Sequence, residues 1–415
     1  MNYQTKVKSN TSKVLPELPS PAKTGRKFLR LVRAAQPISR IEIARRMGVN
    51  RSTVTDLFKP LVAAGVVHES HVRMNSTRAL GRPPMGLTFN SENEFFVGIS
   101  VGVRRSQVGL TTLDGKTLAE DDFPTPPNSR DALELMRSTI EKLSAKISNR
   151  SLKVIGVSVP GVTDAERRKL LYAPHLDWHN VDIAEALRFK SGGKGNKFVP
   201  VIVENDAAAA AIYETSLRLK KTTAGSLSDF ILVRSGTGIG VGLVLDGEVY
   251  RGAGKIEGIA GEFGHMTIVA GGKPCVCGNR GCWERYAAAS AASGLYLGDK
   301  MQSNGVKLRY VDVVERAESG EIRAIKTIEK IGTYLGIGIA NVITGLGVPT
   351  VILSGRIVYG WKFLRQPLHD AIGQSMAGKM NGWSVEPGEP TGAGLGGAFE
   401  VAVEDFLANG FNHII

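Results

Sequence analysis

The hydrophobic pattern of the first 90 residues predicts three short helices followed by a two-stranded hairpin. Apolar residues at helical spacing predict a first helix over residues 24–36. Ser39 and Glu42 have the spacing of a capping box, which predicts the start of a second helix. After a short turn, Asn50 can cap a third helix over residues 51–64.

The second and third predicted helices are joined by a turn at Gly48, which is the arrangement of a helix-turn-helix unit. In such a unit the later helix lies in the major groove of DNA, with its first turn against the base edges. The side chains that we expect to contact bases or phosphates are Arg51, Ser52, Thr53, Thr55 and Lys59. A plain three-helix bundle is the alternative to a DNA-binding unit.

Two further segments predict strands on either side of a basic tip, which is the arrangement of a wing. The expected strands are residues 66–69 and 86–89. Between them, residues 81–84 (Gly-Arg-Pro-Pro) form a stiff segment that presents Arg82, and this suits a narrow A·T-rich minor groove. The same segment suits a rigid linker between domains, and both interpretations stay open.

Charge separates this N-terminal part from the rest of the chain, which has 415 residues and a formal net charge of +13. Residues 1–90 contain 16 Lys and Arg against 4 Asp and Glu, whereas the remaining residues are nearly balanced. A basic module on a neutral body is typical of a nucleic-acid binder. We therefore expect a mobile basic arm over residues 1–22, a winged helix-turn-helix DNA-binding domain over 23–90, and a separate body over 91–415.

The body alternates between strand-like and helical patterns, which indicates an α/β fold. Residues 95–115 are predicted to form two strands and an Asp-Gly turn, and residues 230–247 repeat this order 132 residues later. A repeat at a fixed distance indicates a duplicated fold. We expect two α/β lobes with a cleft between them and a lobe boundary near residues 204–206.

The composition also excludes some classes of protein. No run of 18 apolar residues exists, and the first 20 residues contain no hydrophobic signal core. A membrane-spanning or secreted protein is therefore not expected, and we predict a cytoplasmic one.

The only three cysteines of the sequence cluster close to a histidine. Cys275, Cys277 and Cys282 follow His265, and two glycines among them permit tight turns. Three thiolates and one imidazole make a closed tetrahedral zinc site. We predict a structural zinc ion (Zn²⁺) on these four residues, and buried cysteines without metal are the alternative.

Two polar segments follow predicted strands of the body. Asn205 and Asp206 end one strand and open an alanine-rich helix, where Asp206 could accept a hydroxyl proton. Helix capping is the alternative role for this pair. Gly236, Thr237 and Gly238 form a glycine-rich turn whose amides could cradle a phosphate or a sugar hydroxyl, although such hairpin turns are common.

Together these motifs resemble the ROK family, which comprises repressors, open reading frames and kinases. The resemblance covers nearly the whole chain from about Thr24, and it is closest to the sugar-responsive repressors with an N-terminal winged helix. It implies a duplicated, two-lobed actin-like or hexokinase-like ATPase fold whose C-terminal helix packs back on the first lobe. It also implies a sugar site that shares His265 with the zinc ion and consists of Asn205, Asp206, Glu262, His265 and Glu284. The segments that carry the resemblance are residues 81–83, 155–161, 204–206, 236–240, 262–265 and 275–284.

The sequence departs from the kinases of this family at the first phosphate loop. Those kinases have Asp-x-Gly-Gly-Thr there, whereas residues 100–104 are Ser-Val-Gly-Val-Arg, so the carboxylate that would manage Mg²⁺ is a serine. Ala208 also stands where the family often has Asn. We therefore predict no catalytic residue. Asp206 is then a vestigial general base, and residues 236–238 are a vestigial phosphate loop.

The preferred hypothesis is a sugar-responsive DNA-binding transcriptional regulator, specifically a repressor of carbohydrate uptake or catabolism genes. A pair of recognition helices requires two half-sites related by two-fold symmetry. We therefore expect a homodimer or a dimer of dimers on double-stranded operator DNA. One alternative is an active ATP-dependent sugar kinase that carries a DNA-binding domain. Another is a constitutive DNA-binding protein that has lost its ligand. The sequence leaves the sugar and the operator open.

Overall fold

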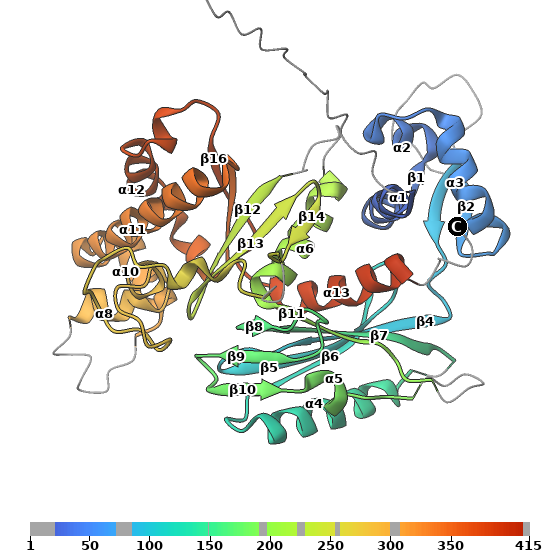
Figure 1. Cartoon of the computed structure of the whole chain (residues 1–415), viewed down its shortest axis with the longest axis horizontal. Helices are drawn as coiled ribbons and strands as arrows, with labels where there is room; N and C mark the ends of the chain where they lie inside the picture. Colours follow the sequence, from blue (N-terminus) through green and yellow to red (C-terminus); the bar gives the residue numbers. More distant parts are fainter. Residues whose placement is uncertain are drawn as a thin grey trace, which may run out of the picture.

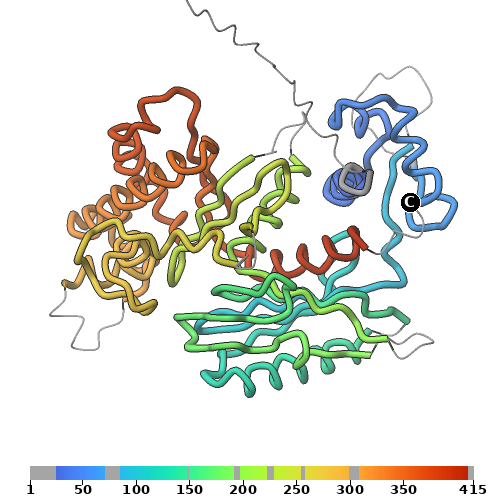
Figure 2. The backbone as a smooth tube through the Cα atoms, viewed as in Figure 1, coloured from blue at the N-terminus to red at the C-terminus, as the bar shows by residue number. Residues whose placement is uncertain are grey.

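The computed structural model describes residues 21–71, 85–147, 149–190, 197–221, 229–253, 258–298 and 308–409. These residues form a small head and two α/β lobes, as Figure 1 shows. The tube in Figure 2 shows that the first helix lies close to the last one, although they stand at opposite ends of the chain. Within the described ranges, no helix combines the length and the apolar character needed to cross a bilayer.

The head consists of three helices and a three-stranded antiparallel sheet. The helices are α1 (Pro21–Ala35), α2 (Arg40–Met47) and α3 (Arg51–Ala63). The strand order of the sheet is β1 (Ile38–Ser39), β3 (Met85–Phe89), β2 (Val67–His71). α1 begins three residues before the predicted start, because proline suits the first position of a helix. The buried core includes a residue that the sequence pattern did not single out, Phe58, together with Phe28, Val54, Leu61 and Leu87.

The start of α2 has one of the two contacts of the predicted capping box, the one made by the Ser39 side chain. Ser39 Oγ accepts a hydrogen bond from Glu42 N at 3.2 Å, as a capping box requires. The Glu42 carboxylate instead binds Arg45 and Arg46 on its own helix. These contacts, with the Arg45 hydrogen bond foremost, lower the pKa of Glu42 to about 2. Asn50 occupies the N-cap position of α3 as predicted, but its side chain makes no cap hydrogen bond.

The first lobe is built on a mixed five-stranded sheet. Its strand order is β11 (Val201–Asn205), β7 (Ser151–Val159), β4 (Glu94–Ser100), β5 (Arg105–Thr111), β6 (Thr117–Pro124). The first three strands of this order are parallel, and the last three are antiparallel. α4 (Ser129–Ser144) lies on one face and α13 (Ala393–Asn409) on the other. A small sheet and a short helix complete the lobe: β8 (Val162–Thr163), β9 (Leu170–Ala173), β10 (Trp178–Val181) and α5 (Ile183–Ala186).

The second lobe repeats this plan. Its strand order is β14 (Glu248–Tyr250), β13 (Ile239–Leu245), β12 (Phe230–Ser235), β15 (Thr350–Ser354), β16 (Ser384–Pro387). α6 (Asp206–Lys221) packs on one face of this sheet. The other face contributes to a larger core with the helices α8 (Ala291–Leu297), α10 (Tyr310–Glu318), α11 (Ile322–Leu346) and α12 (Trp361–Gly373). The short helices are α7 (Glu284–Ala287), η1 (Glu262–His265), η2 (Arg356–Gly360) and η3 (Ala377–Lys379).

The predicted repeat corresponds to β4–β5 in one lobe and β12–β13 in the other, and a third antiparallel strand, β6 or β14, extends each pair. In each lobe a parallel strand, β7 or β15, pairs with the first strand of the unit. α6 and α13 contact each other and fill the space between the two sheets (Figure 1). The close approach of α13 to β7 depends on Gly156, where an added Cβ would lie 2.2 Å from the Ala398 carbonyl oxygen. The two lobes therefore meet along a pair of tightly packed helices.

Candidate functional site

A cleft of about 920 Å³ opens between the lobes. The first lobe contributes the ends of β4 and β11, and the second contributes the β12–β13 turn, η1 and the start of α7. The first turns of α13 form part of the wall. This volume lies in the range of about 300–1,000 Å³ that is usual for small-molecule sites.

Asn205 lies where β11 ends and α6 begins, and it has two structural roles. Its Oδ1 accepts a hydrogen bond from Ala207 N at 2.9 Å, so it caps α6. Its Nδ2 donates to the Gly161 carbonyl oxygen at 3.0 Å and to Glu262 Oε1 at 3.3 Å. The sequence left helix capping and a place in the cleft as alternative roles for this residue. Asn205 has both roles.

Asp206 forms an ion pair that the sequence analysis missed. Its Oδ2 lies 2.5 Å from Nη1 of Arg234, which stands near the end of β12. The two side chains are 23% and 31% exposed, so the pair remains open to the cleft. A charged residue directly after the apolar run 230–233 was a signal available in the sequence.

His175, which lies in the loop between β9 and β10, also lines the cleft. Its Nε2 lies 3.3 Å from Oε2 of Glu284, and this contact raises the pKa of His175. Glu284 is only 4% exposed, and His265 Nδ1 lies 3.8 Å from its other oxygen. His175 comes from the first lobe and Glu284 from the second, so only the tertiary structure brings them together.

Glu262 completes a group of three carboxylates in the cleft, with Asp206 and Glu284. Burial, followed by the negative charges of Asp206 and Glu284, raises the pKa of Glu262 to about 7. Its Oε2 lies 3.8 Å from Nε2 of His265. Carboxylates, imidazoles and an amide side by side offer both acceptors and donors, which is the chemistry that sugar hydroxyl groups require.

The glycine-rich turn, residues 236–238, also lines the cleft, beside Glu284 and His175. Gly238 has to be a glycine, because an added Cβ would lie 2.4 Å from Glu284 Oε2 and 3.1 Å from His175 Nε2. Within the turn, the Gly236 amide donates to the Gly238 carbonyl oxygen at 3.0 Å. The Thr237 carbonyl oxygen accepts from Ser290 Oγ at 2.6 Å. The backbone of the turn is thus fixed close to the carboxylates.

The four predicted metal ligands converge in the structure. The ligand atoms of His265, Cys275, Cys277 and Cys282 all lie within 4.8 Å of one another. The Cys277 and Cys282 sulfur atoms are 3.7 Å apart, and Cys275 Sγ lies 3.6 Å from His265 Nδ1. Around a tetrahedral zinc ion, two sulfur ligands lie about 3.8 Å apart and a sulfur–nitrogen pair about 3.6 Å. Burial raises the pKa of the Cys275 and Cys282 thiols, and a bound cation would offset that cost. The residues present fit a zinc ion.

The segment that corresponds to the first phosphate loop, residues 100–104, lines the cleft at the end of β4. Arg104 is exposed, and Ser100 Oγ lies within 2.6 Å of the place where a Cβ on Gly394 would be. α13 therefore approaches this loop closely. No carboxylate stands among these five residues to hold a metal ion.

The head presents most of its predicted DNA-contacting residues along one helix, α3. Arg51, Ser52, Thr53 and Lys59 are exposed on α3. Thr55 is partly buried, and its Oγ1 donates to the Arg51 carbonyl oxygen at 3.0 Å. The predicted wing strands are β2 and β3, which pair in antiparallel register. Arg82 and the rest of segment 81–84 lie outside the described residues.

The fold and the cleft define a two-lobed α/β protein with an N-terminal helical head. The ROK family model matches residues 96–404, and the chain belongs to the ROK family. Among its relatives is the xylose repressor of Bacillus subtilis (strain 168), which is 33% identical over 328 residues, 78% of this chain and 79% of that protein. The DNA-binding transcriptional dual regulator NagC of Escherichia coli (strain K12) is 28% identical over 355 residues, 83% of this chain and 82% of that protein.

A solved structure of similar architecture includes the head as well as the lobes. It is the crystal structure of a ROK family transcriptional regulator described as a homolog of the E. coli MLC protein. The TM-score is 0.70 at 25% sequence identity, and the match covers 94% of this chain and 98% of that one. The likeness therefore extends to nearly all of both chains.

Proposed function

We propose that this chain is a sugar-responsive transcriptional repressor that binds operator DNA through its head and a sugar in the cleft between its lobes. The observation that carries this proposal is the cleft itself, where three carboxylates, two imidazoles and an amide converge. Hydrogen-bonding groups of both kinds suit a neutral, hydroxyl-rich ligand. Two relatives that match most of the chain are named as regulators of this kind. One is a xylose repressor and the other is the DNA-binding transcriptional dual regulator NagC, which supports the same function.

The head supports the DNA-binding half of the proposal by its geometry and charge. α2 and α3 pack against each other, and the first turn of α3 is exposed with Arg51, Ser52 and Thr53. The β2–β3 hairpin beside them would serve as the wing. In this arrangement α3 enters the major groove, and Lys59 lies where it can meet a phosphate. Symmetric operators require two heads, so we propose a homodimer or a dimer of dimers that acts in the cytoplasm, where operator DNA is present.

We propose that His265, Cys275, Cys277 and Cys282 hold one structural zinc ion. A zinc ion with four protein ligands supplies structural cross-linking and leaves no open position for catalysis. The residues themselves would do the positioning. His265 lies beside Glu262 and Glu284, so holding His265 in place also holds the sugar-binding wall.

We further propose that the cleft binds without transferring phosphate. Asp206, the position of a general base, is engaged by Arg234 at 2.5 Å. Phosphate transfer needs a positioned metal ion and an in-line phosphate, and Ser100 and Arg104 supply neither a carboxylate for the metal ion nor a tight glycine turn. The second candidate is an active sugar kinase, which the retained Asp206 and the 236–238 turn favour.

The experiment that tests these proposals begins with a thermal-shift screen of the full-length protein. The panel contains D-xylose, D-glucose, N-acetyl-D-glucosamine and their phosphates. A ligand that binds only the folded state increases the free energy of unfolding by mass action, by about 2.7 kcal/mol at a concentration of 100 times Kd, and Tm rises as a result. DNA that contains the promoter region next to the gene is then titrated with and without the sugar that raises Tm. ATP consumption is followed in parallel, with Asp206→Asn as the control for turnover. Sugar-dependent ATP turnover would establish the kinase instead, and DNA binding that no sugar alters would refute sugar sensing.

A further inference from the structure

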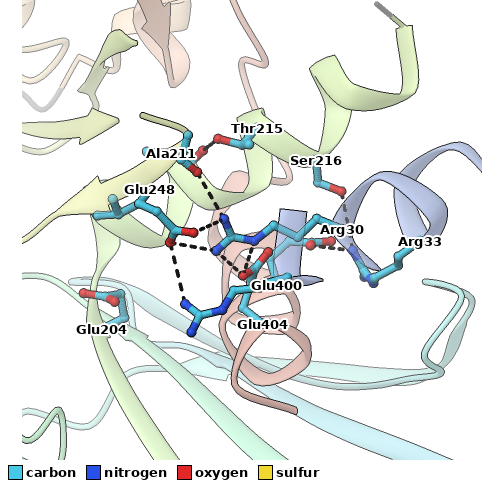
Figure 3. Close-up of polar contacts among 12 residues, drawn as sticks. Arg30, Arg33, Glu204, Ala211, Thr215, Ser216, Glu248, Glu400 and Glu404 are labelled. Carbon is cyan, nitrogen blue, oxygen red and sulfur yellow. Dashed lines mark hydrogen bonds and ion pairs between the residues drawn. The ribbon is translucent and has the colours of Figure 1, made fainter. Parts of the chain in front are cut away.

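The head is fastened to the body by basic residues of α1 that face the lobes. Arg30 and Arg33 lie one turn apart on α1, and Figure 3 shows both side chains directed into the body. Only 13% of the Arg30 side chain and 7% of the Arg33 side chain are exposed. Lys27 of the same helix is more exposed than these two arginines. Its side chain is 30% exposed, and that of its partner Asp246 is 78% exposed.

Arg30 binds two carboxylates that belong to different lobes. Its Nη1 lies 2.7 Å from Glu248 Oε1, and its Nη2 lies 3.1 Å from Glu248 Oε2. Its Nε donates to Glu404 Oε2 at 2.5 Å (Figure 3). Glu248 is the first residue of β14 in the second lobe, and Glu404 lies on α13, which packs on the sheet of the first lobe. We call these three residues the α1 clamp.

Arg33 strengthens the attachment on the side of the first lobe. It binds Glu400 of α13 at 2.5 Å, and its Nε donates to the Leu113 carbonyl oxygen at 3.0 Å. Glu400 is buried, which raises its pKa, and the charge of Arg33 opposes that rise. Arg33 and Glu400 also line the cleft, so one end of the cleft reaches the first helix of the head.

Both elements that hold Arg30 begin at the cleft. β13 starts directly after the 236–238 turn and continues through a tight hairpin into β14, where Glu248 stands. α13 starts among the cleft residues Gly394 and Leu395 and carries Glu404 further along. A strand pair and a helix are stiff, so a displacement of their cleft ends also displaces Glu248 and Glu404 of the α1 clamp.

A second contact ties the far end of β14 to the sugar-binding strand. Arg251, the residue after β14, binds the buried Glu204 through its Nε at 2.9 Å. Glu204 precedes Asn205 on β11, and only 2% of its side chain is exposed. The hairpin that holds Arg30 therefore starts at the cleft-lining turn 236–238 and is fixed at its other end to Glu204, the residue before the cleft residue Asn205.

We propose that Arg30 transmits the relative position of the two lobes to the DNA-binding head. This inference rests on the proposed function, because a sugar in the cleft is what would change that position. A planar guanidinium can satisfy Glu248 and Glu404 together at only one separation of their carboxylates. When the lobes shift, one pair breaks and leaves a buried charge without its partner, and α1 is held less firmly by one lobe. The head then no longer holds the orientation that two half-sites require.

The first test needs no ligand and follows hydrogen–deuterium exchange of α1 amides in the full-length, zinc-loaded protein. Glu248→Gln keeps the shape of the side chain and removes its charge from Arg30, so α1 amides should exchange about 10- to 100-fold faster, the size of a charge-assisted hydrogen bond. The matched control is Asp246→Asn, which removes an exposed partner of the same helix and should change exchange less than threefold, as is usual for exposed pairs. Equal exchange in Glu248→Gln and the wild type would overturn the proposal.

The second test adds D-xylose or N-acetyl-D-glucosamine, each at 50 mM, and compares the wild type with Arg30→Met. A sugar that slows exchange in the 236–240 segment should also change exchange in α1 of the wild type. In Arg30→Met the change at 236–240 should persist while the change in α1 disappears. An α1 response of equal size in both proteins would overturn the proposal. If neither sugar alters the 236–240 segment, the proposed sugar specificity fails for these two sugars, and the ligand-free comparison still decides the role of Arg30.

Discussion

The unusual ionisation of Glu262 gives a prediction with a definite sign. Its pKa in the folded protein is about 7, whereas the ordinary value is 4.5. Between these two values the folded state keeps a proton that the unfolded state has released, so stability falls as pH rises through this window. At about 1.4 kcal/mol per pKa unit, the full loss by pH 7.5 is about 3 kcal/mol.

Glu262→Gln removes the titration and keeps the size of the side chain. The variant should therefore be similar in stability to the wild type near pH 4.5 and more stable by about 3 kcal/mol at pH 7.5. Urea unfolding of both proteins at four pH values between 4.5 and 7.5 would measure this difference. Each pair is compared at the same pH with the same zinc content, so effects of pH on the zinc ligands cancel. A difference between the two proteins that stays constant within about 0.5 kcal/mol over this range would refute the reasoning, since that is the scale of an ordinary surface substitution.

Three further predictions concern DNA, zinc and sugar. Arg51→Ala should weaken operator binding by about 1–3 kcal/mol and relax its sequence preference, whereas Lys59→Ala should weaken all sequences equally and flatten the salt dependence. Fluorescence anisotropy with operator and scrambled duplexes measures the affinity and the sequence preference of both variants. An unaltered sequence preference in Arg51→Ala would contradict the placement of α3 in the major groove. Metal analysis should find roughly one zinc per chain in the wild type, and Cys277→Ser should lose it along with sugar binding, because the ligands share a segment with the cleft wall. Normal sugar binding by metal-free protein would contradict this. Asp206→Ala should lower sugar affinity in calorimetry, while Asp182→Ala, a change at the exposed start of α5, should not. Unchanged affinity in Asp206→Ala would place that residue outside the sugar site.

The strands and helices of the lobes were predictable because their apolar residues repeat with the period of each element. The pattern over residues 95–115 and its copy over 230–247 correspond to β4–β5 and β12–β13. The start of α2 was half predictable. The Ser39 cap is local, but Glu42 had two arginines within four residues, and their charge outcompetes a backbone amide.

The cleft was predictable only where the motif itself contains the contact. Asn205 caps its own helix, and the three cysteines lie so close in sequence that one histidine suffices to complete the set. His175 and Arg234 were missed because their partners, Glu284 and Asp206, are 109 and 28 residues away in the chain, and Glu284 also lies on the other lobe from His175. A pair of this kind leaves no periodic signal.

The sequence by itself determined the α/β class, the duplication, the family and the four residues that could bind zinc, because hydrophobic period, motif spacing and charge are local properties. The tertiary structure alone decided which charges meet. Asp206 is held by an arginine, burial and two nearby carboxylates raise the pKa of Glu262, and Arg30 joins two lobes from a third part of the chain. The physical reason is that Coulomb and desolvation energies depend on distance and burial in space, and these are set only when the sheets, α6 and α13 have packed together.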